Sequence, residues 1–129
     1  MGTICFVILN YKTWREAAAC AEAILKTQQG QDIRIVLVDN GSGNGSEESL
    51  REEFAGEKRV HVIASEKNLG FARGNNLGIR YARSHFEPDF IVAANSDIIF
   101  EQEDYCEKLR EIYKEERFDI LGGDIVDAS

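Results

Sequence analysis

Unbroken apolar runs that alternate with helix-forming segments constrain this chain most. The first run, residues 3–9 (TICFVIL), and the second, residues 33–38 (IRIVLV), have the pattern of strands buried on both faces. Residues 60–64 and 89–94 (DFIVAA) repeat it, with a helical segment between successive runs. Alternating strands and helices predict an α/β fold, a three-layer α/β/α arrangement whose sheet is mainly parallel and carries helices on both faces.

Helix start signals follow the strands. Thr13 to Glu16 has the form of a capping box, and the alanine-rich segment after it predicts a helix that ends near Gly30. Ser46 is the expected N-cap of a short helix. We also expect a helix from the glycine-rich stretch after the third strand to about His85, a charged helix over Glu103–Glu116, and the start of a fifth strand over Asp119–Gly123.

Length and charge limit the possible functions. With 129 residues the chain is large enough for one domain, and its net charge of −8 disfavours nonspecific binding to nucleic acid or to an anionic membrane. The three cysteines, Cys5, Cys20 and Cys106, are widely spaced, which argues against a disulfide framework or a zinc site. No apolar run is long enough to cross a bilayer and no signal peptide is visible. A cytoplasmic setting fits these features.

Polar turns follow each of the predicted strands, at the edge where open α/β sheets bind ligands. They are Asn10-Tyr11, Asp39 to Ser42, the stretch NLGFARGNNLG at residues 68–78, and Asn95 to Asp97. The first turn has no glycine, which excludes a dinucleotide fingerprint, and the chain has no Gly-Lys-[Ser/Thr] of a P-loop. We therefore expect a different kind of nucleotide site.

Two residues of these turns suit a nucleoside, each with a structural alternative. Asp39 could accept hydrogen bonds from a ribose or a base N–H, or it could start an Asx-turn. Tyr11 could stack on a base or pack as a half-buried tyrosine. Both alternatives remain open on the sequence alone.

The stretch after the third strand combines small residues with polar ones. Gly70, Gly74, Gly78 and Ala82 recur every four residues and form one stripe of a helix, which allows close approach to the sheet or to a ligand. Sheet packing explains Gly78 and Ala82 but not the neighbouring Arg73, Asn75 and Asn76. An arginine at a glycine-rich helix start suits a diphosphate or its sugar.

Asp97 is the candidate metal ligand. It lies between two apolar segments, where a carboxylate could hold Mg²⁺ or Mn²⁺ that bridges phosphate oxygens, although it could instead be a turn aspartate. His61 and His85 have no partner at metal-ligand or catalytic-triad spacing, so we interpret both as structural.

Four motifs in order, ILNY, VDNGSGNGS, NLGFARGNN with LGI, and AANSDIIF, resemble the family 2 inverting glycosyltransferases of the GT-A fold, especially the rhamnosyltransferase-like branch. The resemblance covers nearly the whole chain. It implies Mg²⁺ or Mn²⁺ at the metal motif, where Asn95 replaces the first aspartate and Asp97 is the only carboxylate. It assigns no catalytic residue, and it implies a nucleotide-sugar site formed by Asn10, Tyr11, Asp39, Gly41, Ser42, Gly70, Phe71, Arg73, Gly74, Asn75, Asn95 and Ser96.

Family members continue past this length with an acceptor-binding half, so residues 1–129 are expected to be the donor-binding part of a longer bacterial enzyme of cell-wall or polysaccharide synthesis. We expect this part to bind a nucleotide-sugar, to transfer nothing alone, and to self-associate through the apolar surface that the other half would cover. The saccharide acceptor would bind mainly to that other half. In the full-length protein the domain would be cytoplasmic, at the inner face of the membrane. The alternatives are a non-catalytic nucleotide-sugar-binding domain and a nucleotidyltransferase, whose basic glycine-rich loop after the first strand is missing here.

Overall fold

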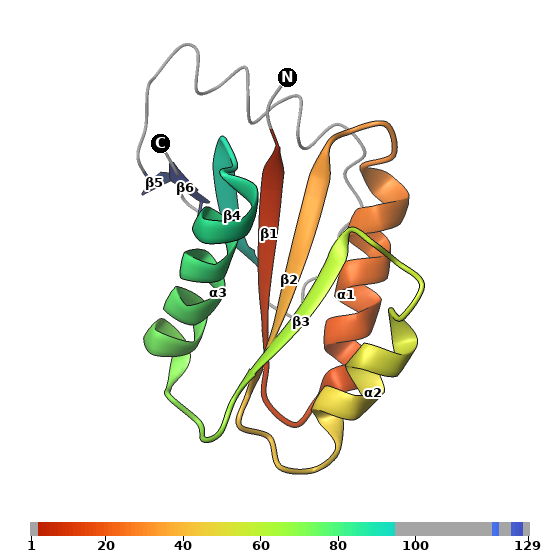
Figure 1. Cartoon of the computed structure of the whole chain (residues 1–129), viewed down its shortest axis with the longest axis vertical. Coiled ribbons are helices and arrows are strands. Elements are labelled where there is room, and N and C mark those ends of the chain that lie inside the picture. The colour runs from red at the N-terminus through yellow and green to blue at the C-terminus, as the bar shows by residue number, and fades with distance from the viewer. Residues whose placement is uncertain (1–2, 95–119, 122–124, 128–129) are drawn as a thin grey trace.

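The computed structural model describes residues 3–94, 120–121 and 125–127, and within them the strands form one sheet in the order β3-β2-β1-β4-β6-β5 (Figure 1). The strands are β1 (Ile4–Asn10), β2 (Ile33–Asn40), β3 (Val60–Ser65), β4 (Phe90–Ala94), β5 (Ile120–Leu121) and β6 (Ile125–Asp127). The helices are α1 (Trp14–Thr27), α2 (Ser46–Glu53) and α3 (Phe71–Phe86).

The pleat of the central strands divides the core into two halves. Phe6 of β1 and Leu37 of β2 are fully buried beneath α1 and α2, with Ala21 and Ile24 of α1. Val7, one residue after Phe6, is buried on the opposite face beneath α3. Successive side chains of a strand point to opposite faces, so continuous apolar runs are what a sheet covered on both sides requires.

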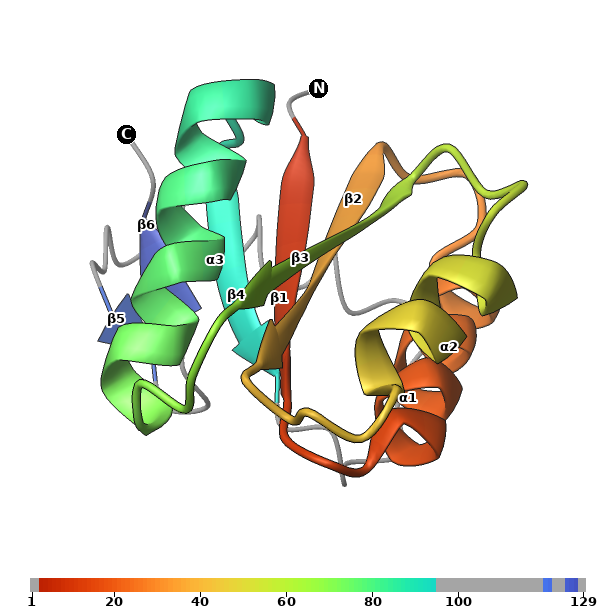
Figure 2. The same ribbon diagram turned by 60° about the horizontal axis from the view of Figure 1, so that its bottom comes forward.

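The direction of the crossovers explains which helix covers which face. The chain moves outward from β1 through β2 to β3, and α1 and α2 both lie on one face (Figure 2). It then returns through α3, on the other face, to place β4 on the far side of β1. Right-handed crossovers in opposite directions put their helices on opposite faces, which confirms the predicted three-layer fold.

Strands run further toward their carboxyl ends than the apolar runs predicted. β1 continues to Asn10, β2 continues to Asn40, and the parallel ladder pairs Asn10 with Asp39 and Asn40 with Ser65. These polar residues stay in the sheet because their backbone groups bond to a neighbouring strand whatever their side chains are.

The helix caps differ from the prediction in detail. Thr13 is the N-cap of α1, but it makes no side-chain cap hydrogen bond, and its hydroxyl lies 3.5 Å from Asn10 Oδ1, so the capping box does not form. Gly45, not Ser46, is the N-cap of α2, and Asn44 Oδ1 accepts the Ser46 hydroxyl at 2.6 Å. α1 ends at Thr27, slightly before the expected Gly30.

The carboxyl-terminal strands differ from simple alternation. β6 was not predicted, and it pairs antiparallel with β4, while β5, a shortened form of the expected fifth strand, pairs antiparallel with β6. Asp127 of β6 pairs with Phe90 of β4. The predicted helix over Glu103–Glu116 lies outside the described residues.

Candidate functional site

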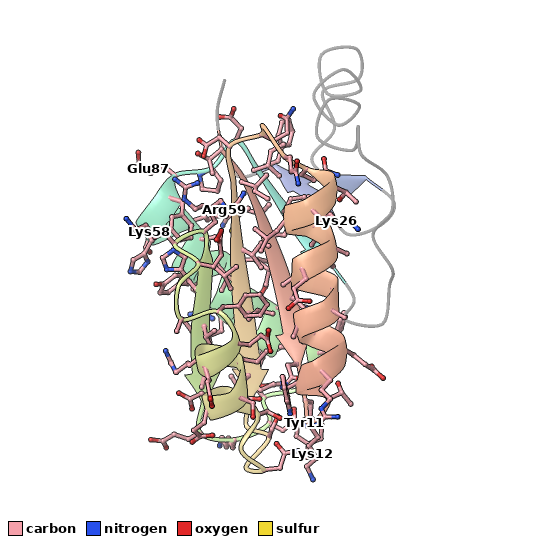
Figure 3. All side chains as sticks on the ribbon, turned by 90° about the vertical axis from the view of Figure 1, so that its right-hand side faces the viewer. Tyr11, Lys12, Lys26, Lys58, Arg59 and Glu87 are labelled. Atoms are coloured by element: carbon pink, nitrogen blue, oxygen red, sulfur yellow. The ribbon has the colours of Figure 1, made fainter. Side chains whose placement is uncertain are left out.

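Asn10 and Asp39 meet at the carboxyl end of the central strands. They are register partners on β1 and β2, and both continue the face of the sheet that α1 and α2 cover, since Ile8 and Leu37 precede them by two residues. Figure 3 shows Tyr11 and Lys12, which follow Asn10, at this end of the sheet, and Lys58, Arg59 and Glu87 at the opposite end. The predicted meeting of the first two turns is therefore observed.

Hydrogen bonds converge on one oxygen of the Asp39 carboxylate. Asn10 Nδ2 donates to Asp39 Oδ1 at 3.0 Å, and the Ser42 hydroxyl donates to the same oxygen at 2.5 Å. Asn10 and Ser42 are themselves buried, with exposed fractions of 0% and 5%. The hydrogen bonds found among the described residues leave Oδ2 of this carboxylate unengaged.

A cleft of about 410 Å³ opens beside Asp39, between the end of β2 and the start of α2. Asp39 is only 4% exposed, so its carboxylate forms part of the floor of the cleft and is not a surface charge. The remaining lining is glycine backbone, serine and acidic side chains: Gly41, Gly43, Gly45, Glu47, Glu48, Ser65 and Glu66. Such a wall offers hydrogen-bond acceptors to a ligand rich in N–H and O–H donors.

Gly41 shapes this cleft by letting two loops cross at van der Waals distance. Its φ is +70°, and a Cβ atom at this position would lie 2.2 Å from the carbonyl carbon of Lys67. An L side chain is disfavoured by the backbone angle, and here it would also overlap main-chain atoms that cannot rotate away.

Asn40, which the sequence analysis did not single out, fixes the loop between β3 and α3. Its Nδ2 donates to Asn68 Oδ1 at 3.0 Å and to the Gly70 carbonyl at 3.2 Å, and its Oδ1 accepts the Leu69 amide at 3.0 Å and the Ser65 hydroxyl at 3.3 Å. The sequence could have indicated this role, because successive side chains of a strand point to opposite faces, so Asn40 must lie on the face opposite to Asp39.

Two glycines of the predicted stripe, Gly70 and Gly74, have different roles at the start of α3. Gly70 is the N-cap, with φ of +85° and open space where a Cβ atom would be. Gly74 is buried, a Cβ atom there would lie 2.7 Å from Leu9 Cδ1, and its amide donates to the Gly70 carbonyl. The structure therefore gives Gly74 a packing role, as for Gly78, and leaves its backbone amide unavailable to a ligand.

Of the other candidates, Phe71, Arg73 and Tyr11 are accessible, whereas the side-chain oxygen of Asn75 is not. Arg73 is exposed, and Phe71 exposes 54% of its surface. Asn75 Oδ1 is buried and has no hydrogen-bond partner within the part of the chain described. Tyr11 is 43% exposed, with Lys12 Nζ 5.2 Å from its ring centroid, and it is not among the cleft-lining residues.

The predicted metal motif, Asn95, Ser96 and Asp97, lies outside the described residues. Within residues 3–94, 120–121 and 125–127, no three His, Cys, Asp or Glu side chains are grouped as a metal site would require. The expected ligand Asp97 is outside the part of the chain that the structure describes, so the metal site stays a prediction.

His61 and Cys5 are not among the residues that line the cleft. The ring of His61 lies tilted against those of Tyr81 and Phe86, and burial, followed by the charges of Arg34 and His85, lowers the pKa of His61. Burial raises the pKa of the Cys5 thiol to about 12. In the described residues, no helix has the length and apolar character needed to cross a membrane.

Curated relatives match most of the length of this chain. The chain is 33% identical over 120 residues to the glycosyltransferase GlyG of Streptococcus pneumoniae serotype 4, covering 93% of this chain and 38% of that protein. It is 27% identical over 113 residues to the low-salt glycan biosynthesis hexosyltransferase Agl10 of Haloferax volcanii, covering 88% and 32%. The chain thus spans about a third of the length of the curated relatives it matches.

Solved structures show the same fold at low sequence identity. The mannosyltransferase PcManGT of Pyrobaculum calidifontis, in complex with GDP-Man and Mn²⁺, matches with a TM-score of 0.74 and 15% identity over 87% of this chain and 32% of that one. S. aureus TarS 1-349 in complex with UDP-GlcNAc matches with a TM-score of 0.70 and 17% identity over 91% and 32%. The family model described as "Glycosyl transferase family 2" matches residues 5–129. The chain therefore belongs to glycosyl transferase family 2.

Proposed function

We propose that this chain is the donor-binding part of an inverting, metal-assisted glycosyltransferase of the rhamnosyltransferase-like branch. It would bind a nucleotide-diphosphate sugar whose sugar is then transferred to a saccharide or other acceptor. In the transfer, the acceptor hydroxyl oxygen bonds to the anomeric carbon, the bond from that carbon to the diphosphate breaks, and a base takes the hydroxyl proton. Membership of the family supports the reaction class, and the name of the relative Agl10 supports a role in glycan assembly.

One observation carries the donor-binding part of the proposal: a buried carboxylate, Asp39, forms the floor of a cleft at the ligand edge of the sheet. A buried charge is disfavoured unless hydrogen bonds compensate it, and Asn10 and Ser42 provide two such bonds to Oδ1. The remaining oxygen can accept a base N–H or a ribose hydroxyl. Gly41 allows the loop after β2 to pass close to the main chain of Lys67 beside the cleft, and the exposed ring of Tyr11 is available for stacking.

The diphosphate and sugar are assigned to the start of α3 and the turn after β4. The exposed guanidinium of Arg73 can bond phosphate oxygens in a bidentate manner. Asn75 Oδ1 lacks a donor in the described chain, and a shift of its side chain toward the surface would let it accept a sugar hydroxyl. Gly70 and Phe71 would lie beside them, and Asn95, Ser96 and Asp97 would complete the site. When bound, Mg²⁺ or Mn²⁺ at Asp97 would neutralise the charge that develops on the leaving diphosphate.

Calorimetric titration of UDP, GDP and dTDP into the chain, with Mn²⁺ present, tests the proposal. Asp39→Asn keeps the shape of the side chain but turns the ligand-facing oxygen into a donor. It should weaken binding about 10- to 100-fold, the range for a lost hydrogen bond to a charged group. The matched control is Glu87→Gln, the same change at the opposite end of the sheet, which should leave binding unchanged. Equal affinity of Asp39→Asn and wild type would remove Asp39 from the site.

A thermal-shift series tests the metal separately. Stabilisation by the nucleotide should increase with Mn²⁺, because one protein carboxylate needs phosphate oxygens to complete the coordination shell. Asp97→Asn should abolish the increase. Stabilisation that is indifferent to Mn²⁺, in the wild type, would contradict the metal-assisted part and leave nucleotide binding intact.

A further inference from the structure

Ser42 has no hydrogen-bonding capacity left for a ligand. A serine hydroxyl has one proton and two lone pairs. The proton goes to Asp39 Oδ1 at 2.5 Å, and the oxygen accepts the backbone amide of Lys12 at 2.7 Å and faces Asn10 Nδ2 at 3.5 Å. The side chain is also only 5% exposed. A direct contact from this hydroxyl to a nucleotide would therefore require breaking an existing bond.

The same hydroxyl joins the turn after β1 to the loop after β2. Lys12 has φ of +65°, an unfavourable backbone angle for a residue with a side chain. Its amide is bound by Ser42, and its carbonyl accepts Asn44 Nδ2 at 3.4 Å. The Ser42 hydroxyl thus binds both the Lys12 amide of this strained turn and the Asp39 carboxylate.

We propose that Ser42 is a positioning residue for the donor nucleoside: its hydroxyl holds Asp39 Oδ1, so that Oδ2 is presented to the cleft before the ligand arrives. Asn10 Nδ2 shares Oδ1 and keeps the carboxylate plane from rotating. A carboxylate already fixed in the binding orientation loses little rotational freedom when the ligand binds. This inference rests on the proposed function, since it presumes that Asp39 meets the nucleoside.

The test is a double-mutant cycle on nucleoside diphosphate affinity, with NMR titrations that reach millimolar ligand. Ser42→Ala should weaken binding about 3- to 10-fold in the wild-type background, the cost of ordering one side chain. In the Asp39→Asn background it should have no further effect, because the group that Ser42 orients no longer accepts from the ligand. An equal loss in both backgrounds would show that Ser42 contacts the nucleotide itself and would overturn the proposal.

Ser46→Ala is the matched control for general loosening of the loop. Ser46 is the first residue of α2 and directly follows this loop, it is only 1% exposed, and its hydroxyl donates to Asn44 and not to Asp39. Nucleotide affinity should be unchanged in this variant, and a loss equal to that of Ser42→Ala would also overturn the proposal. Ser42→Thr, which retains the hydroxyl, should restore most of the affinity.

Faster hydrogen exchange of the Lys12 amide in Ser42→Ala, in the absence of nucleotide, is the structural readout of the lost bond. Unchanged protection of that amide would contradict the proposed geometry.

Nucleotide binding by the wild type distinguishes failure of the proposed function from failure of the positioning role of Ser42. If it binds none of UDP, GDP or dTDP, the proposed function fails; if it binds one and Ser42→Ala binds equally well, only the positioning role fails.

Discussion

Gly78→Ala should destabilise the protein although alanine favours helices. Gly78 lies inside α3, where alanine is about 1 kcal/mol better than glycine in intrinsic helix propensity. An added methyl group would lie 2.5 Å from Val7 Cγ1 and 2.8 Å from Val38 Cγ2, well inside ordinary contact distances. Both valines are fully buried on central strands, and their branched side chains have few alternative rotamers.

The magnitude follows from comparing these two effects. Overpacking a close-packed core typically costs about 1–3 kcal/mol, because side chains or the helix must shift. Subtracting a propensity gain of about 1 kcal/mol leaves a net destabilisation on the order of 1 kcal/mol. Urea unfolding followed by the fluorescence of Trp14, the only tryptophan, gives the free energy of unfolding. The difference between Ser84→Ala and Ser84→Gly, at an exposed position of α3, measures the glycine-to-alanine propensity effect without the contact.

A background variant identifies the cause. Val7→Ala removes the nearest methyl group and leaves Val38 Cγ2 in place, so adding Gly78→Ala in this background should cost less than in the wild type, with a coupling on the order of 1 kcal/mol between the two sites. If Gly78→Ala stabilises the otherwise wild-type protein by the full helix-propensity gain, α3 does not approach the sheet as closely as described, and the packing role of the stripe is refuted.

Three further predictions concern Gly41, Cys5 and His61. Gly41→Ala should lower both stability and nucleotide affinity, because of its positive φ and the overlap with Lys67; titration and urea unfolding that match the wild type would contradict this. Cys5 should resist thiol reagents at pH 8 until the protein unfolds, because burial raises its pKa to about 12, and mass spectrometry showing fast native labelling would disprove it. The pKa of His61 is lowered from 6.5, so the unfolded state takes up the proton first and stability should fall as the pH drops below that value. His61→Gln should flatten this dependence, and an unchanged slope between pH 5 and 7 would assign it to other groups.

The order of strands and helices was predictable because a strand that is buried on both faces is a continuous apolar run in the sequence. Where the strands end was not, since Asp39 and Asn40 look like turn residues and yet remain in the ladder. The antiparallel pairing of β6 with β4 depends on a partner far away in the chain, for which three residues, Ile125 to Asp127, carry no local signal.

The sequence predicted which residues meet at the site, but not the role of each residue there. Asn10, Asp39 and Ser42 were expected at one edge and do meet there. The sequence did not reveal that Ser42 is fully engaged within the protein, because hydrogen-bond saturation is a property of three-dimensional neighbours. It also could not decide which way Gly74 faces, since a stripe of small residues fits a sheet and a ligand equally well until the helix is docked.

The position of β1 in the middle of the sheet has a consequence for how the chain folds during synthesis. Among the strands of this sheet β1 is synthesised before the others, and β2 can pair with it early, but its other neighbour, β4, is made only after α3, when Phe90 can pair with Ile4. Until then one edge of the most apolar strand, and the core half beneath α3, stay open to other chains. Such long-range parallel pairing slows folding and prolongs exposure to aggregation, so this region should depend on chaperones more than its modest size suggests.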